Sequence, residues 1–382
     1  MKGNTIMSII IGADLVPTKS NIDLFADGNI MELIGERLKH VLDNATYRIF
    51  NLETPLADNP SPIQKQGPNL ITPTRCVAGF KEMGVNLLTL ANNHIMDQDI
   101  AGLNSTIKIL QNAGISYTGI GENIESASEP FYFTFKNIKI GVYACAEHEF
   151  SIADEERPGA NPFDPLETPD HIQHLKDQCD YAIVLYHGGK EQYRYPSPQL
   201  QKTCRKLIEK GADLVVCQHS HCIGCKEEYK KGTIVYGQGN FIFDHKNNEY
   251  WNTGLLICIS DSLQIEYIPI TKQGNVIRLA SGSERESILS DFYSRSEEIK
   301  DYHFVEAKYV EFARKNNDFY MLYFSGQKTN LLFRIINKCS GYRLQKNVAR
   351  NYKKHNYLGL RNYIECEAHR ELLIEGLKKI VE

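Results

Sequence analysis

The hydrophobic and polar positions of this chain follow two alternating patterns over its first two-thirds. Short apolar runs typical of strands are separated by longer segments with apolar residues at helical spacing. Strands are expected at residues 6–11, 47–52, 85–90, 131–135, 138–144, 182–186, 214–217, 233–236, 255–259 and 265–270. Helices are expected at residues 31–42, 76–83, 100–112 and 200–208, and around Leu175. This alternation predicts an α/β domain whose sheets are covered by helices.

Two of the expected strands are joined by a very short connection. Only Lys136 and Asn137 separate the runs at 131–135 and 138–144, which favours a β-hairpin. Hairpin strands are antiparallel, whereas strands joined through a helix run parallel. We therefore expect mixed sheets.

The pattern changes near residue 283. The remainder of the chain is rich in charge and in helical periodicity, and Gly, Asn and Ser recur just before it, between Gly274 and Ser283. We predict one domain over residues 1–275 and a mainly helical C-terminal extension over residues 283–382. An apolar stripe near the end is interpreted as core or docking surface; it consists of Leu372, Leu373, Leu377 and Ile380.

Composition excludes several classes of protein. The 382 residues are 42% hydrophobic and 24% charged, which excludes a disordered chain or a fibre. Lys and Arg number 43 against 47 Asp and Glu, so the net charge of −4 gives no footprint for nucleic acid, and no such partner is expected. The ten scattered cysteines are predicted to be reduced thiols. Cys222 and Cys225 form a C-x-x-C motif without a second pair, and we interpret them as incidental thiols.

No segment has the length and apolar composition of a membrane span. The first apolar run, from Ile6 to Ala13, follows a single Lys2 and ends at Asp14. That pattern fits a first strand better than a signal peptide, which needs a basic start and a small-residue cleavage site. We expect a cytoplasmic protein.

Polar side chains follow six of the expected strands at the point where each strand ends. In open α/β sheets, sites form beyond the carboxyl ends of the strands. In chain order the six endings contribute Asp14; Asn51 and Glu53; Asn92, Asn93, His94 and Asp97; His187 and Glu191; His219 and His221; and Asn240. One residue separates His219 from His221, and alternate residues of an extended segment point to the same side. Together the six endings predict one site rather than six unrelated features.

The residue types in these endings are ligands for divalent metal ions. Carboxylate oxygen and imidazole nitrogen without thiolate suit Mn, Fe, Zn or Mg. The set is large enough to hold two ions with a carboxylate between them, and two ions can activate water and clamp both oxygens of an in-line displacement. Taken singly, each ending has an ordinary alternative: Asn92 and Asn93 fit a turn, Glu191 a surface charge, and Asn240 a β-turn.

The order and combination of these motifs resemble the CapA family of capsule synthesis proteins, also called the poly-γ-glutamate synthesis family. The resemblance covers residues 6–270, and its motifs are Gly12–Asp14, Asn51–Glu53, Ala91–His94 with Asp97, His187–Glu191, Gln218–His221 and Tyr236–Phe241. That family is similar to the calcineurin-like metallophosphoesterases. The resemblance implies a four-layer α-β-β-α sandwich in which two mixed sheets pack face to face.

The resemblance also implies a role for each residue of the site. Asp14 and His221 would bind one divalent ion, and Glu53 would bridge to the second. The second ion would be held by Asn93, His187 and His219. His94 would act as general acid or charge stabiliser, oriented by Asp97. The residues implied to bind substrate are Asn51, Asn92, Glu191 and Asn240.

Three positions depart from the phosphoesterase pattern. Val16 stands where those enzymes have a His, Glu53 where they have an Asp, and Ala13 where they have a Gly. The first two changes affect the first ion site, so we expect it to be weaker or to prefer another metal.

These observations predict a metal-dependent hydrolase that uses metal-activated hydroxide on a phosphoester or related substrate, with a link to capsule or poly-γ-glutamate metabolism. Two alternatives stay open. One is an amide (γ-glutamyl) hydrolase or transferase at the same site, and the other is a non-catalytic accessory protein of polymer biosynthesis. The substrate is expected to be a small molecule or a polymer.

Two clusters in the extension are given ordinary interpretations. The basic segment 343–354 is interpreted as a solvated helix face. Glu365, Cys366 and His369 form a possible ligand cluster. Because Glu365 and His369 lie four residues apart, we interpret them as an ordinary side-chain pair on a helix surface.

Overall fold

The computed structural model describes residues 8–243, 248–326 and 331–381. The chain divides into two compact units, Met1–Val305 and Glu306–Glu382, which are described separately. Lys2 and Ile6, which entered the prediction of the first strand, lie outside the described residues.

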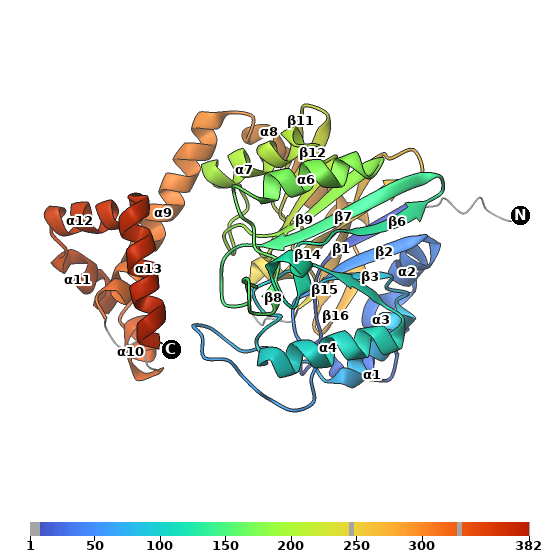
Figure 1. Ribbon diagram of the computed structural model, residues 1–382, viewed down its shortest axis with the longest axis horizontal. Helices are drawn as coiled ribbons and strands as arrows, with labels where there is room; N and C mark the ends of the chain where they lie inside the picture. The colour runs from blue at the N-terminus through green and yellow to red at the C-terminus, as the bar shows by residue number, and fades with distance from the viewer. Residues whose placement is uncertain (1–7, 244–247, 327–330, 382) are drawn as a thin grey trace, which may run out of the picture. The chain divides into compact units, whose positions relative to one another are not determined.

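The first sheet has eight strands and contains both parallel and antiparallel neighbours (Figure 1). Its parallel part consists, in spatial order, of β1 (Ser8–Val16), β2 (Tyr47–Leu52), β3 (Leu87–Thr89) and β4 (Ser116–Thr118). On the other side of β1 lie the antiparallel strands β14 (Thr253–Ser260), β15 (Ile265–Gln273) and β16 (Val276–Leu279). β13 (Asn240–Phe243) pairs in parallel with the last residues of β1.

The second sheet has six strands, of which the central four are parallel. These are β7 (Ile138–Ala146), β9 (Tyr181–His187), β10 (Leu214–Gln218) and β12 (Gly232–Tyr236). The antiparallel edges are β6 (Phe131–Phe135), which forms the predicted hairpin with β7, and β11 (Lys226–Tyr229). A separate short pair joins β5 (Ile120–Gly121) to β8 (Gly159–Ala160).

The two sheets pack face to face, with helices on both outer faces. Ile9 and Ile11 of β1 pack in one core with residues of the second sheet, among them Ile183 and Val216. Ile10, which lies between them, points to the opposite face of the first sheet and packs in a second core, formed with the helices that cover that face. This division follows from the period of two in a strand. The predicted α-β-β-α sandwich with mixed sheets is therefore confirmed.

Four helices cover the first sheet and two cover the second (Figure 1). The first set is α1 (Ile22–Ala26), α2 (Ile30–Asn44), α3 (Val77–Glu82) and α4 (Asp99–Ala113). The second set is α6 (Thr168–Asp177) and α7 (Pro198–Glu209). The shorter helical turns are η1 (Thr74–Cys76), α5 (Ile124–Ala127) and η2 (Glu249–Asn252).

Helices follow β16 to the end of the described chain, as the sequence predicts. They are α8 (Gly282–Glu298), α9 (Tyr302–Phe324), α10 (Leu331–Cys339), α11 (Arg343–Asn351), α12 (Lys354–Glu365) and α13 (Glu367–Val381). The structural division falls later than the predicted one at 275–283, because Phe292 of α8 and Val305 of α9 are buried in cores of the first unit. None of the described helices combines the length and apolar composition needed to cross a membrane.

Two smaller expectations can be compared with the structure. All ten cysteines are free, and Cys222 and Cys225 are buried, in agreement with reduced thiols. Glu365 and His369 do not share one helix, because α12 ends at Glu365 and Cys366 has extended backbone. Glu365 instead forms an ion pair with Arg361 at 2.8 Å.

Candidate metal centre

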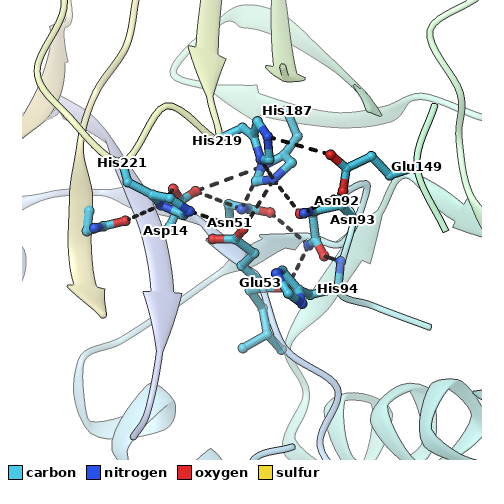
Figure 2. A network of polar contacts seen from close by, with 12 residues as sticks. Asp14, Asn51, Glu53, Asn92, Asn93, His94, Glu149, His187, His219 and His221 are labelled. Carbon is cyan, nitrogen blue, oxygen red and sulfur yellow. Dashed lines mark hydrogen bonds and ion pairs between the residues drawn. The ribbon is translucent and has the colours of Figure 1, made fainter. Parts of the chain in front are cut away.

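The carboxyl ends of the parallel strands of both sheets meet at one edge of the sandwich. Figure 2 shows that the polar residues following these strands converge there. The structure brings together all twelve residues that the sequence singled out: Asp14, Asn51, Glu53, Asn92, Asn93, His94, Asp97, His187, Glu191, His219, His221 and Asn240.

Asp14 lies within β1, because this strand continues beyond its expected end at Ile11 and ends at Val16. A register shift between Ile11 and Asp14 places Asp14 opposite Asn51 of β2. Asn51 Nδ2 donates to Asp14 Oδ1 at 2.8 Å, and His221 Nδ1 lies 3.3 Å from Asp14 Oδ2. The carboxylate is fully buried, so its orientation is fixed by these partners.

Glu53 is the most unusual group of the site. Its side chain is fully buried, yet neither Oε1 nor Oε2 has a hydrogen-bond partner among the described residues. The nearest imidazole nitrogens are Nε2 of His187 at 3.3 Å and Nε2 of His221 at 3.9 Å from Oε1. A buried carboxylate without hydrogen bonds is costly unless a cation compensates it. Glu53 therefore has the environment expected of a metal ligand.

His187 and His219 lie on the other side of Glu53. His187 Nε2 is 3.0 Å from Asn93 Oδ1 and 3.1 Å from His219 Nδ1 (Figure 2). Two imidazole nitrogens and an amide oxygen are thus directed at one another at the end of β9. Asn93 Nδ2 in turn donates to Glu149 Oε2 at 2.9 Å, which fixes the amide with its oxygen toward His187.

The backbone of His219 and His221 corrects one expectation. The sequence predicted an extended segment, but both residues have positive φ, 80° for His219 and 53° for His221. Left-handed backbone is unfavourable for a residue with a side chain and is concentrated at functional sites. Both rings still face the centre, because the chain curls beyond β10 instead of continuing as a strand.

The side chains form overlapping groups of metal ligands. Within each group, one ligand atom per residue lies within 4.8 Å of the others. The groups are Asp14, Glu53 and His221; Glu53, His187 and His219; and Glu191, His219 and His221. The first two share Glu53, whose two oxygens accept no hydrogen bond. The donor set of carboxylate and imidazole fits divalent cations such as Mn, Fe, Zn or Mg.

Burial and mutual charge shift the pKa values of these groups strongly. Burial, aided by the charge of Asp14, raises the pKa of Glu53 from 4.5 to about 8. Burial lowers the pKa of His187 to about 4. Burial alone would also lower the pKa of His221, but the carboxylates of Glu53 and Asp14 raise it to about 10. The raised pKa values mean that Glu53 and His221 hold protons that offset the negative charge of the buried carboxylates. A bound cation would offset the same negative charge.

The raised pKa of Glu53 predicts how the stability of metal-stripped protein depends on pH. The folded chain holds this proton to higher pH than the unfolded chain, so the stability it contributes is present below pH 4.5 and is lost as the pH rises to about 8. The expected loss is at most about 1.4 kcal/mol per pH unit. Chemical unfolding in a chelator from pH 5 to 8 should show Glu53→Gln gaining stability relative to wild type as the pH rises. Exposed Glu122→Gln is the control, and parallel curves for wild type and Glu53→Gln would contradict the assignment.

His94 and Asp97 form a second polar group beside the centre. His94 Nδ1 lies 2.5 Å from Asp97 Oδ2, and Asp97 is completely buried. The ammonium group of Lys65 forms an ion pair with Asp97 Oδ1 and lies 3.2 Å from His94 Nδ1. Asp97 also accepts a hydrogen bond from Leu70 N at 2.6 Å. Asp97 therefore holds both the His94 ring and the loop that carries Lys65.

A cavity of about 500 Å³ opens beside these residues. Its lining includes Lys65, Asn93, His94, Glu149, Phe150 and Glu191. His94 and Asn93 belong at once to the cavity wall and to the polar network of Figure 2. A molecule in the cavity would therefore lie against the candidate metal centre, and the volume of the cavity suits a small molecule or the end of a polymer.

Three residues predicted to bind substrate instead contact each other or the candidate metal ligands. Asn51 and Asn92 are fully buried, and Asn92 Nδ2 donates to Asn51 Oδ1 at 3.1 Å. Asn240 Oδ1 lies 2.8 Å from His221 Nδ1. Glu191, in contrast, is exposed and lines the cavity. These contacts favour a positioning role for the three asparagines and leave Glu191 as the substrate-facing residue of the four.

Sequence reasoning missed several residues that build the site. Glu149 follows β7, so the strand-end pattern that identified the other ligands also applies to it. Lys65 lies in a loop without periodic pattern, and nothing in the sequence marks it. Gln238 belongs to the motif Tyr236–Phe241 but was given no role; its Nε2 donates to Ile11 O at 2.8 Å and thereby ties the loop after β12 to β1. Gly239 beside it has φ of 76°, where a Cβ would lie 2.7 Å from Thr253 O.

Val16, the departure from the phosphoesterase pattern, is buried and contributes no ligand. It lies opposite Phe243 of β13, and the rings of Phe243 and Trp251 lie 5.5 and 4.5 Å from that of His221. Aromatic rings thus border the first ligand group, which consists of Asp14, Glu53 and His221.

Comparisons with known proteins agree with this picture. The family model described as "Bacterial capsule synthesis protein PGA_cap" matches residues 14–245. The chain is 32% identical over 212 residues to "Capsule biosynthesis protein CapA" of Bacillus anthracis, covering 53% of this chain and 52% of that protein. It is 28% identical to "PGA biosynthesis protein CapA" of Bacillus subtilis (strain 168), covering 46% and 47%. The chain thus spans about half the length of the curated relatives it matches.

Among solved structures, a phosphatase from Mycoplasma pneumoniae is similar at 14% sequence identity with a TM-score of 0.44. The likeness covers 70% of this chain and 95% of that one.

Proposed function

The chain belongs to the bacterial capsule synthesis protein PGA_cap family, and on that premise we propose that it is a metal-dependent hydrolase acting on a phosphoester or related bond. The observation that carries the proposal is Glu53, a fully buried carboxylate without hydrogen bonds, shared between two groups of metal ligands. A structural role alone gives no reason to bury a carboxyl group that no hydrogen bond satisfies.

Two groups of residues would hold divalent cations, one formed by Asp14, Glu53 and His221 and the other by Glu53, His187 and His219. Bound cations would supply Lewis acidity and a nucleophilic water. The chain itself would orient the ligands: Asn51 holds Asp14, and Asn240 holds His221. These second partners fix ring and carboxylate orientation, as outer partners do in metal sites generally.

His94 would act on the substrate. Asp97 occupies Nδ1, so Nε2 is the ring nitrogen that would donate a proton to the leaving oxygen. Because Lys65 and Asp97 form a buried ion pair beside the ring, His94 is held against the cavity wall with little freedom. Glu191, which also lines the cavity, would contact the substrate.

The names of the relatives suggest the origin of the substrate. Two Bacillus relatives are named for capsule and PGA biosynthesis, so we place the substrate in the metabolism of such polymers. Those names also support a second candidate, hydrolysis or transfer of a γ-glutamyl amide, since a nucleophilic water activated by metal can attack a carbonyl carbon. A non-catalytic accessory role in polymer synthesis is the third. The cytoplasmic location stays a prediction.

One experiment tests the three candidates. Metal-stripped protein is reconstituted with Mn, Fe, Zn or Mg, and turnover is measured on phosphate monoesters, phosphate diesters and a γ-glutamyl anilide. We expect phosphoester turnover that requires metal and is abolished by chelation. Cleavage of the anilide alone would favour the amide hydrolase. Metal binding without turnover of any of these substrates would favour the accessory role.

A further inference from the structure

Residues 306–382 bury very little of their own apolar surface. Among the described residues of this unit, the buried ones are Met321, Leu322, Asn337 and Ala349. Large hydrophobic side chains on every helix from α9 to α13 except α11 are instead exposed. Monomeric proteins rarely leave contiguous apolar patches uncovered, and such patches mark interaction surfaces.

Helix α10 has an exposed apolar side and a buried polar side. Its exposed apolar residues lie between 47% and 72% exposed and are Leu331, Leu332, Ile335 and Ile336. Their spacing places them on one side of the helix. The opposite side carries Asn337, which is 6% exposed and donates through Nδ2 to Gln345 Oε1 of α11 at 3.0 Å. The helix therefore packs its polar side against α11 and presents its apolar side outward.

The sequence around α10 is rich in positive charge. Residues 319–364 contain nine Lys or Arg and no Asp or Glu, in a chain whose net charge is −4. Arg343, Lys346 and Arg350 of α11 are all exposed and spaced to share one side of the helix. The sequence of segment 343–354 alone is typical of a solvated helix face, but in the structure its neighbour α10 has an exposed apolar side.

We propose that α10 and α11 bind the surface of an anionic lipid bilayer. An interfacial helix inserts aliphatic side chains at the boundary of headgroups and acyl chains, while basic residues beside it attract anionic headgroups. Both features are present here on adjacent helices. A second copy of the chain would bring the same nine cations against each other, and a nucleic acid would leave the aliphatic side of α10 uncovered.

The proposed lipid-binding residues of α10 and α11 are independent of the candidate metal centre, because none of them belongs to the ligand groups or lines the cavity.

The proposal is tested by mixing the full chain with vesicles of phosphatidylcholine, with or without phosphatidylglycerol, and measuring the bound fraction by sedimentation. We expect binding to the anionic vesicles, weak binding to the neutral ones, and release from the anionic vesicles as salt is raised.

Two pairs of substitutions separate the electrostatic and apolar contributions. Lys346→Gln with Arg350→Gln should lower partitioning onto anionic vesicles by about tenfold or more. Leu332→Ser with Ile336→Ser should also lower it by about tenfold. The matched control, Lys202→Gln with Lys231→Gln, removes two exposed lysines from the first unit and should change nothing. All these positions are exposed, and circular dichroism and metal content verify that each variant remains folded.

Four results would overturn the proposal. They are equal binding to neutral and anionic vesicles, no binding to anionic vesicles at low salt, an equal loss of binding in the control variant, and tighter binding to duplex DNA than to vesicles. Dimers in sedimentation velocity that disappear in Leu332→Ser with Ile336→Ser would assign the apolar face to a second copy instead.

Discussion

Replacing His187 and His221 together by alanine is expected to remove bound metal and, with it, all metal-dependent turnover. Each ligand group that contains Glu53 loses one of its histidines: His221 from the group with Asp14, and His187 from the group with His219. Each group is then left with two ligands, Asp14 and Glu53 in one and Glu53 and His219 in the other, and divalent ions in proteins are held by at least three. We expect metal content to fall from that of wild type to near none.

The measurement is metal content per chain by elemental mass spectrometry, after reconstitution with Mn, Fe or Zn and gel filtration. The control pair, His174→Ala with His303→Ala, removes two exposed histidines and should retain the wild-type content. Full metal content in the variant that lacks His187 and His221 would rule out both ligand groups. Loss of a part of the wild-type content would show that one group survives without its histidine.

The helices and strands were predictable from the sequence where their apolar residues recur at a regular spacing. Tyr47–Leu52 is a strand with the predicted bounds, and α4 ends at Ala113, one residue beyond the predicted end, before the left-handed Gly114. Among the strands that were not predicted, one is charged and another is very short. β11 is a charged edge strand of sequence KEEY, and β13 is a short strand whose pairing depends on the last residues of β1. Such strands exist because a neighbour offers free backbone groups, which a local pattern does not reveal.

The candidate site was predictable to a similar degree, and for a physical reason. The rule that sites form beyond the carboxyl ends of parallel strands needs only strand ends, so it identified, without a structure, residues that the fold brings together. It could not separate residues that face the cavity from residues behind the ligands. Asn51 lies near the end of β2 and Glu191 follows β9, yet Asn51 is fully buried and Glu191 is exposed. Nor could it find Lys65, which reaches Asp97 only because Leu70 and Gln98 fasten its loop.

Replacing His94 by alanine is expected to lower turnover by about 10²–10⁴-fold while metal content stays at the wild-type value. His94 lines the cavity and contacts Asp97 through Nδ1. Because His94 belongs to none of the ligand groups, its removal should leave those groups intact. The loss should depend on the leaving group. An alkyl phosphate needs a proton on its leaving oxygen and should show the full effect, whereas a nitrophenyl phosphate, whose leaving group is stable as an anion, should show much less.

The matched control is His148→Ala, because His148 is an exposed histidine that lines the same cavity. It should alter binding of substrate more than the rate of the bound complex, whereas His94→Ala should do the reverse, with kcat reduced and KM little changed. An equal loss on alkyl and nitrophenyl phosphates would assign His94 to stabilising charge on the phosphoryl group instead of protonating the leaving oxygen. Turnover unchanged in His94→Ala would remove His94 and Asp97 from the reaction altogether, and the buried pair of Asp97 with Lys65 would then serve only to fasten the loop at the cavity wall.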